Sequence, residues 1–167
     1  MIDYAKLRRA ESLLDLEDED KFSLSGLTKK AKKFLLSQHW CKQVDKTFIG
    51  MAYEGIIGVF YAEIEPTDPR IDRGLWVVVG DLPSAYLVTD RSPDAASAVE
   101  SYIVEMRDWV DAARNGLSVK DLIPVNVEPT KEYAELLESR LDFLEQRILP
   151  HFRSGDPDHA QEFIEDQ

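Results

Sequence analysis

The sequence holds one cysteine, three histidines and no long apolar run, and each scarcity argues against a class of protein. Cys41 has no second cysteine with which to form an intramolecular disulfide, so nothing suggests folding in an oxidising compartment. No stretch approaches the roughly 20 apolar residues of a membrane-spanning helix, and the N-terminus lacks the apolar segment of a signal peptide. His39 stands near Cys41, but zinc sites usually need two such pairs of ligands. We therefore expect a cytoplasmic protein with no metal site and no cofactor.

Basic residues are also scarce, because 20 Lys and Arg stand against 32 Asp and Glu, for a net charge of −12. The imbalance is uneven: residues 1–46 hold ten basic and eight acidic residues, whereas residues 47–167 hold ten and twenty-four. Nucleic-acid binding depends on cationic side chains that neutralise phosphates, so this composition argues against it. We expect no membrane contact either. An anionic body suits solubility alone or an encounter with a basic protein partner.

The length of 167 residues fits one domain with its own hydrophobic core. Within that single domain the sequence divides into three parts with different expected secondary structure. Residues 1–46 are expected to be helical, residues 47–150 to hold the sheet and the main helices, and residues 151–167 to form a polar tail.

The strongest strand signal is the stretch from residue 74 to residue 88. The apolar runs Leu75–Val79 and Ala85–Val88 flank Gly80–Pro83, a short connection with turn-forming residues, which predicts a β-hairpin. With Ile56–Ile64 they make three consecutive strands, most simply a β-meander. Leu75–Val79 is apolar on both faces and should be a central strand covered on both sides. The expected fold class is α+β, with an antiparallel sheet of three to four strands.

Helical spacing and capping signals predict two N-terminal helices and two longer C-terminal ones. Their expected spans are Asp3 to about Leu16, Leu27 to about His39, Ser92 to Arg114, and Thr130 to Leu149 before Pro150. The tail past Pro150 could hold a brief helix through Ile164. The first two helices would cover the second face or an end of the sheet; if they leave that face open, a homodimer could form there.

Two segments are less clear. Residues 47–58 combine helical spacing with three glycines and receive no assignment. Ile123–Glu128, bounded by prolines, should be extended, either as an edge strand or as a strap across the sheet.

Three blocks of the chain resemble a family of small, uncharacterised bacterial proteins. They are Gly58–Phe60, the W-V-V-V-G-D-L-P-S-A-Y-L-V block Trp76–Val88, and Leu122–Asn126. The resemblance implies a bacterial, cytosolic, single-domain protein. It supplies no catalytic residue, because the family has no activity to carry over.

A first candidate surface is acidic. Glu100, Glu105, Asp108 and Asp111 lie on the outward side of the helix predicted after Ser92 and could bind a basic partner. Paired carboxylates also occur in di-iron sites, but those need histidines that this helix lacks. A solvated helix face is the plain alternative.

A second candidate site lies near the hairpin turn. Asp81, Tyr86, Trp76 and Asn126 could line a ligand site there, with Asp81 as its one acid–base group. The plain alternative is that Asp81 caps its own turn, as Asp side chains often do, and that the aromatic residues are core.

Three functions follow from these observations. The first is a non-catalytic interaction protein, for instance an immunity or antidote protein that masks a basic toxin or nuclease. The second is a small-molecule-binding protein or small enzyme with its site near Gly80–Pro83. The third is a subunit or regulator of a bacterial assembly.

Overall fold

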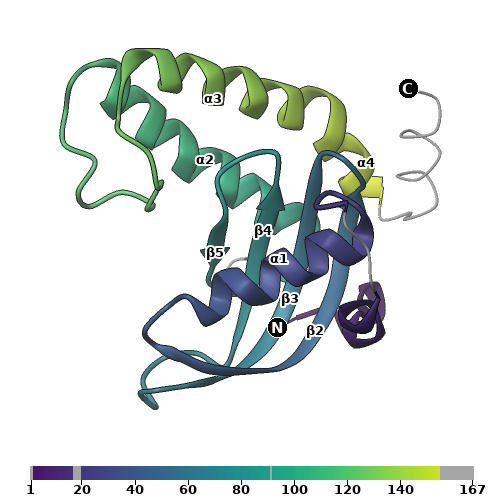
Figure 1. Ribbon diagram of the computed structural model, residues 1–167. Coiled ribbons are helices and arrows are strands. Elements are labelled where there is room, and N and C mark those ends of the chain that lie inside the picture. Colours follow the sequence, from purple (N-terminus) through teal and green to yellow (C-terminus); the bar gives the residue numbers. More distant parts are fainter. Residues whose placement is uncertain (1, 17–19, 91, 155–167) are drawn as a thin grey trace.

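The structure is a computed structural model and describes residues 2–16, 20–90 and 92–154. It is an α+β fold built on a five-stranded antiparallel sheet whose strands follow one another in sequence order (Figure 1). The strands are β1 (Arg8–Arg9), β2 (Cys41–Tyr53), β3 (Ile57–Pro66), β4 (Gly74–Gly80) and β5 (Ala85–Leu87). The α+β class and the meander are confirmed, and the sheet is larger than the three to four strands expected.

Strand β2 occupies the segment that received no assignment. It begins at Cys41, inside the stretch expected to be helical, and pairs with β3 from Cys41 opposite Pro66 to Tyr53 opposite Ile57. The register shifts at three places along this pair. Each irregularity displaces the alternation of inward and outward side chains, which is why the sequence shows no clean strand pattern there.

The N-terminal helix predicted from Asp3 to Leu16 is wrong. This segment forms two 3-10 turns, η1 (Tyr4–Lys6) and η2 (Glu11–Asp15), on either side of β1. The backbone N–H of Ala10 donates to the carbonyl of Thr47 at 2.9 Å, and that of Asp3 donates to the carbonyl of Pro93 at 3.0 Å. Short helices are only marginally stable by themselves, so pairing with the sheet takes the place of the helix.

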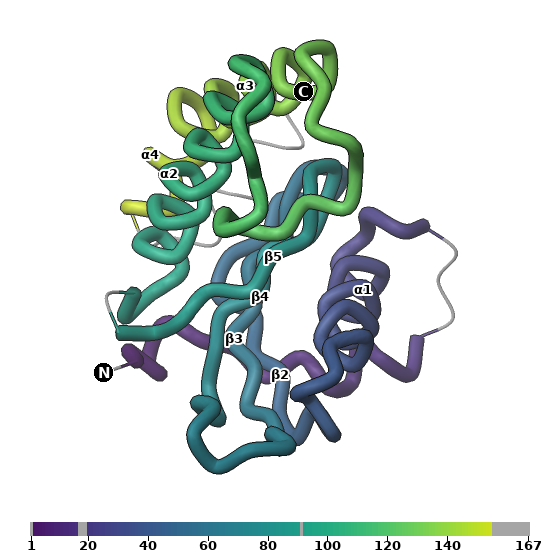
Figure 2. Tube along the Cα trace, turned by 90° about the vertical axis from the view of Figure 1, so that its left-hand side faces the viewer, coloured from purple at the N-terminus to yellow at the C-terminus, as the bar shows by residue number. Residues whose placement is uncertain are grey.

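Helices cover both faces of the sheet (Figure 2). Helix α1 (Leu24–Leu36) lies on one face, while α2 (Ala95–Arg114) lies on the other with α3 (Lys131–Phe143) packed on it. Strand β4 is the predicted central strand, with Trp76 and Val78 in the core beneath α2 and Leu75, Val77 and Val79 in the core beneath α1. Because α1 occupies the second face, that face is not open for a dimer contact.

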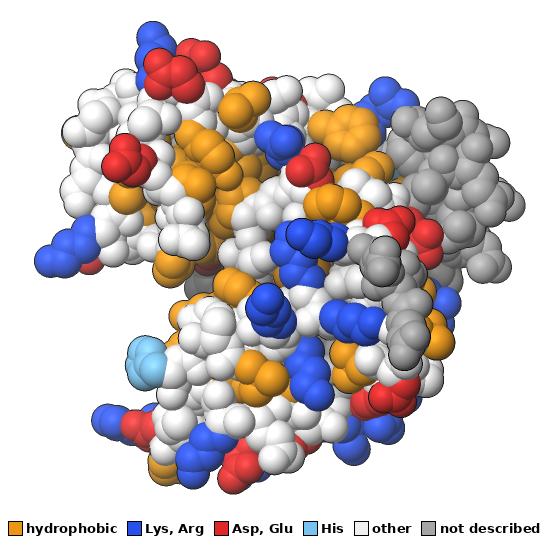
Figure 3. Space-filling model, in the orientation of Figure 1, with side chains coloured by type: hydrophobic (Ala, Val, Ile, Leu, Met, Phe, Trp, Pro, Cys, Tyr) orange, Lys and Arg blue, Asp and Glu red, His pale blue; other side chains and the backbone are white. Residues whose placement is uncertain are grey.

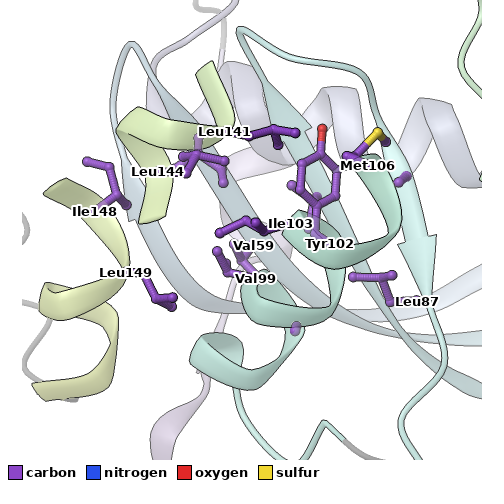
Figure 4. Packing of buried hydrophobic residues seen from close by; sticks show 14 of the residues in the cluster. Val59, Leu87, Val99, Tyr102, Ile103, Met106, Leu141, Leu144, Ile148 and Leu149 are labelled. Atoms are coloured by element: carbon purple, nitrogen blue, oxygen red, sulfur yellow. The ribbon is translucent and has the colours of Figure 1, made fainter. Parts of the chain in front are cut away.

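The core beneath α2 joins the sheet to all the C-terminal helices (Figure 4). Val59 and Leu87 come from the strands and Tyr102 and Met106 from α2, and Leu141 comes from α3. All five side chains are buried. This packing fixes α2 over strands β3, β4 and β5, with α3 held against α2.

Helix α1 begins earlier than predicted. Its N-cap is Ser23, whose hydroxyl accepts a hydrogen bond from the N–H of Gly26 at 3.1 Å, so the helix starts three residues before the predicted Leu27. Helix α2 begins later than predicted, because Asp94 and Ser97 form a reciprocal capping box two residues after Ser92.

The last helix does not stop at Pro150. After α3 the chain makes a π-helical turn, η3 (Leu144–Ile148), and continues as α4 (Leu149–Ser154). A proline has no N–H for the preceding helical turn, and the wider π turn is a place where a helix accommodates this loss. The predicted tail helix through Ile164 lies outside the described residues. In the described ranges no helix combines the length and the apolar character needed to cross a membrane.

Candidate functional site: a groove beside strand β5

A groove of about 1210 Å3 runs beside β5 and opens on the face shown in Figure 3. One side is formed by Phe22 and by α1, and the base is formed by residues 80–88 of the β4–β5 hairpin. The other side is formed by α3 and by residues 119–127, the loop that passes β5 in Figure 2. This loop contains the predicted strap. It forms no strand, and it flanks the sheet instead of extending it.

Strand β5 is the last strand of the sheet, so one of its two edges is open. Its inner edge pairs with β4, with Ala85 opposite Val78, Tyr86 opposite Val77 and Leu87 opposite Trp76. No backbone hydrogen bond joins its outer edge to any other described residue. The open edge therefore presents backbone donors and acceptors to the groove.

The floor of the groove is aromatic on the side of α1. Tyr86 is half-buried and stands edge-on to Trp40, with 4.8 Å between the ring centroids. Phe34 of α1 lies 6.4 Å from the same ring. Aromatic rings in such contacts provide a large apolar surface of fixed shape.

The turn at the end of the groove is held by neighbouring elements. Gly80 has a φ of +146°, and its carbonyl accepts a hydrogen bond from Lys30 Nζ at 3.1 Å. The N–H of Asp81 donates to the carbonyl of Ile56 at 3.0 Å. From the α2 side, the hydroxyl of Tyr102 donates to the carbonyl of Pro83 at 2.6 Å, and burial raises the pKa of this phenol well above its ordinary value. The turn is thus tied to α1, to the residue that precedes β3, and to α2.

The charged groups of the groove are mostly cationic. Lys30, Lys120 and Arg140 line it with Asp81 and Glu105. Arg140 lies 3.5 Å from the Asp81 carboxylate, while neither lysine has a carboxylate of a described residue within 4.0 Å. Burial raises the pKa of Glu105, and the nearby charge of Asp108 adds to this effect.

Three of the four predicted ligand-site residues, Asp81, Tyr86 and Asn126, line this groove. Trp76 does not: it is fully buried beneath α2, and its indole N–H donates to the carbonyl of Ser92 at 2.6 Å. The Asp81 carboxylate faces Arg140, and it accepts no hydrogen bond from the described residues of its own turn.

The four predicted partner-binding carboxylates of α2 do not form one free acidic face. Glu100 accepts hydrogen bonds from Arg153, with a shortest distance of 2.7 Å, and Asp111 lies 4.0 Å from Arg114. Glu105 lies at the edge of the groove, and Asp108 is exposed.

Sequence reasoning missed Lys30 and Phe34 of α1 and Arg140 of α3. The available signal was the helical spacing, since Lys30, Phe34 and Ser37 lie three or four residues apart and therefore share one side of α1.

Within the described part of the chain, no three His, Cys, Asp or Glu side chains gather in a way that could hold a metal ion. Comparisons with protein-family models, with curated proteins and with solved structures found no match to this chain. The groove and the open edge of β5 are therefore the features from which a function can be inferred.

Proposed function

We propose that the protein is a non-catalytic interaction protein that binds a protein partner in the groove beside β5. The observation that carries the proposal is the open outer edge of β5, which lies in an apolar groove between α1 and the 119–127 loop. An unpaired sheet edge invites pairing with another chain, and many interaction domains use it in this way.

The size of the groove supports a protein partner over a small ligand. Pockets that enclose small molecules typically measure roughly 300–1,000 Å3. This groove measures about 1210 Å3 and is open along the surface in Figure 3. An extended chain segment fits such a shape, and the edge of β5 would supply its backbone hydrogen bonds.

Two more specific forms of this function remain predictions. One is an immunity or antidote protein that masks a basic toxin or nuclease, for which the net charge of −12 would speed the encounter. The other is a subunit or regulator of a bacterial assembly. A homodimer also stays a prediction, although α1 already covers the sheet face considered for it.

A small-molecule-binding protein or small enzyme is the second candidate. The observation in its favour is that Asp81, Tyr86 and Asn126 line the same groove. Asp81 would be its acid–base group, held next to Arg140.

Co-purification with two serine-to-tryptophan variants tests the proposal. Ser37 lines the groove, whereas Ser139 is an exposed α3 residue outside it, so Ser37→Trp should fill the groove and Ser139→Trp should not. We expect a protein partner to bind the wild type and Ser139→Trp but not Ser37→Trp. Equal recovery with both variants would show that the partner binds elsewhere. A small ligand that raises the melting temperature of the wild type, with no protein partner, would favour the second candidate.

A further inference from the structure

The geometry points to an extended, acidic and apolar segment of the partner as the occupant of the groove, paired with the outer edge of β5. This inference rests on the proposed function and adds the binding mode and the chemistry of the bound segment. Two independent features carry it: the direction of the β5 side chains and the charge of the groove walls.

Side chains of β5 alternate between the two sides of the sheet. Tyr86 packs with the core beneath α1, and Ala85 and Leu87 pack with the core beneath α2. A strand added beside β5 would continue this alternation, so every second side chain would lie toward Phe34 and Tyr86. The others would lie toward the 119–127 loop and α3, where Leu122, Val125 and Leu136 supply apolar lining. The added segment should therefore carry apolar residues on both sides.

The walls of the groove decide the charge of the segment. Lys30 of α1 lines the groove. Lys29, Lys32 and Lys33 stand in the same helix outside the groove lining, and α1 has no acidic residue. None of these lysines lies within 4.0 Å of a carboxylate of a described residue, and blue side chains gather over α1 in Figure 3.

Lys120 on the opposite wall is likewise without such a carboxylate, so cations face the groove from two sides. Asp81 offers little to oppose them, because it faces Arg140. Glu105, exposed at the α2 edge of the groove, is the other acidic residue among the described lining residues. A segment with Asp or Glu residues would gain charge-assisted hydrogen bonds to these lysines, whereas a basic segment would meet like charge.

The base of the groove is already ordered. The Gly80–Pro83 turn is held by Lys30, by the carbonyl of Ile56 and by Tyr102. Binding to a preformed edge costs less conformational entropy than binding to a mobile one.

Peptide selection with a displayed library of random ten-residue sequences tests the inference. The selected peptides would be measured by fluorescence anisotropy against the wild type, Lys30→Glu, Lys120→Glu and the control Lys42→Glu. Lys120 and Lys42 are both exposed, and only Lys120 lines the groove. Circular dichroism melting of each variant would show that it is folded. Because Lys30 also contacts the turn, Lys120→Glu keeps the test decisive if Lys30→Glu unfolds.

We expect the selected peptides to be rich in Asp or Glu and in apolar residues. Their affinity should fall about tenfold with a reversed charge at Lys120 or Lys30 and stay unchanged with Lys42→Glu. N-methylation of every second peptide amide should abolish binding in one register and spare it in the other, since only alternate amides reach β5.

Three results would overturn the inference. The first is the selection of peptides rich in Lys or Arg. The second is binding that persists when either set of alternate peptide amides is N-methylated. The third is that every selected peptide binds Ser37→Trp as well as it binds the wild type. If a partner still requires the groove by the tryptophan test, the proposed function stands and the occupant is a folded surface. If the tryptophan variants bind the partner equally, the proposed function itself is wrong.

Discussion

Replacing Gly80 with alanine should destabilise the protein far more than the same replacement at Gly116. Both glycines have a positive φ, +146° at Gly80 and +66° at Gly116. A Cβ atom at Gly80 would lie 2.2 Å from the carbonyl oxygen of Ile56 and 2.8 Å from the Cα of Ile57. At Gly116 the same atom would have nothing within 4 Å. Gly116→Ala therefore measures a positive φ without a clash, whereas Gly80→Ala measures a different positive φ together with a clash against backbone atoms.

The structure sets the size of the difference. A left-handed conformation costs an alanine about 1–2 kcal/mol, and this is the expected loss at Gly116. At Gly80 the clash is with backbone atoms, so it is relieved only if the turn moves away from β3. That movement would weaken the Asp81 N–H bond to Ile56 and the Lys30 bond to the Gly80 carbonyl. We expect a loss of about 3–5 kcal/mol there.

Urea unfolding followed by tryptophan fluorescence measures both variants. The entropy that alanine removes from the unfolded chain is similar at the two positions and cancels in the comparison. With a urea dependence of about 1–3 kcal/mol per molar, the midpoints should differ by about 1 M. Equal midpoints for the two variants would refute the reasoning, because they would show that the turn moves away from β3 at no cost.

Three further predictions concern the core, a helix cap and the thiol. Trp76→Phe removes a buried 2.6 Å hydrogen bond and should lower the free energy of unfolding by about 1–3 kcal/mol, as measured by urea titration; wild-type stability would contradict this bond. Burial opposes ionisation of Asp94, but hydrogen bonds from Ser97 and the Lys6 ammonium outweigh it and lower the Asp94 pKa. The stability that this group adds is therefore complete above its unfolded pKa of about 3.8 and is lost as the pH falls through the lower folded value, so the deficit of Asp94→Ala, about 1 kcal/mol at pH 7, should vanish in acid. Burial raises the pKa of the Cys41 thiol, so a disulfide reagent should label the native protein much more slowly than the urea-unfolded protein, and equal rates would show that the site is open.

The elements that sequence reasoning located are those whose signals lie within a short window. Leu75–Val79 is apolar on both faces, and its structure as central strand β4 follows directly. The predicted end of the helix at Arg114 is the observed end of α2, and Gly116, two residues later, has a φ of +66°. In both cases the deciding residues are neighbours in the chain.

The elements that it missed depend on contacts between distant residues. Arg8 and Arg9 become a strand only because β2 offers Ile49 and Phe48 as partners some 40 residues later. Strand β2 itself is obscured by register shifts that exist only relative to β3. Prediction from hydrophobic periodicity assumes a regular helix or strand without register shifts, and neither β1 nor β2 satisfies that assumption.

The residues of the candidate site also fall into those that the local sequence predicts and those brought in from distant positions in the chain. Asp81 and Tyr86 were identified because they adjoin a recognisable turn. Lys30 reaches that turn from 50 residues earlier, and Arg140 reaches Asp81 from 59 residues later. No local pattern indicates such contacts, so the cationic walls of the groove could not be predicted.

The charge of the groove lining therefore need not have the same sign as the net charge of the whole chain. At physiological ionic strength the electrostatic potential of an exposed charge decays over about 8 Å. A segment lying along β5 is then governed by Lys30 and Lys120, which line the groove, more than by acidic residues on distant surfaces. The net charge of −12 acts mainly on diffusing partners at longer range and low salt. A partner with a basic body and an acidic, extended docking segment satisfies both conditions, because its body would be attracted to the protein and its segment to the groove.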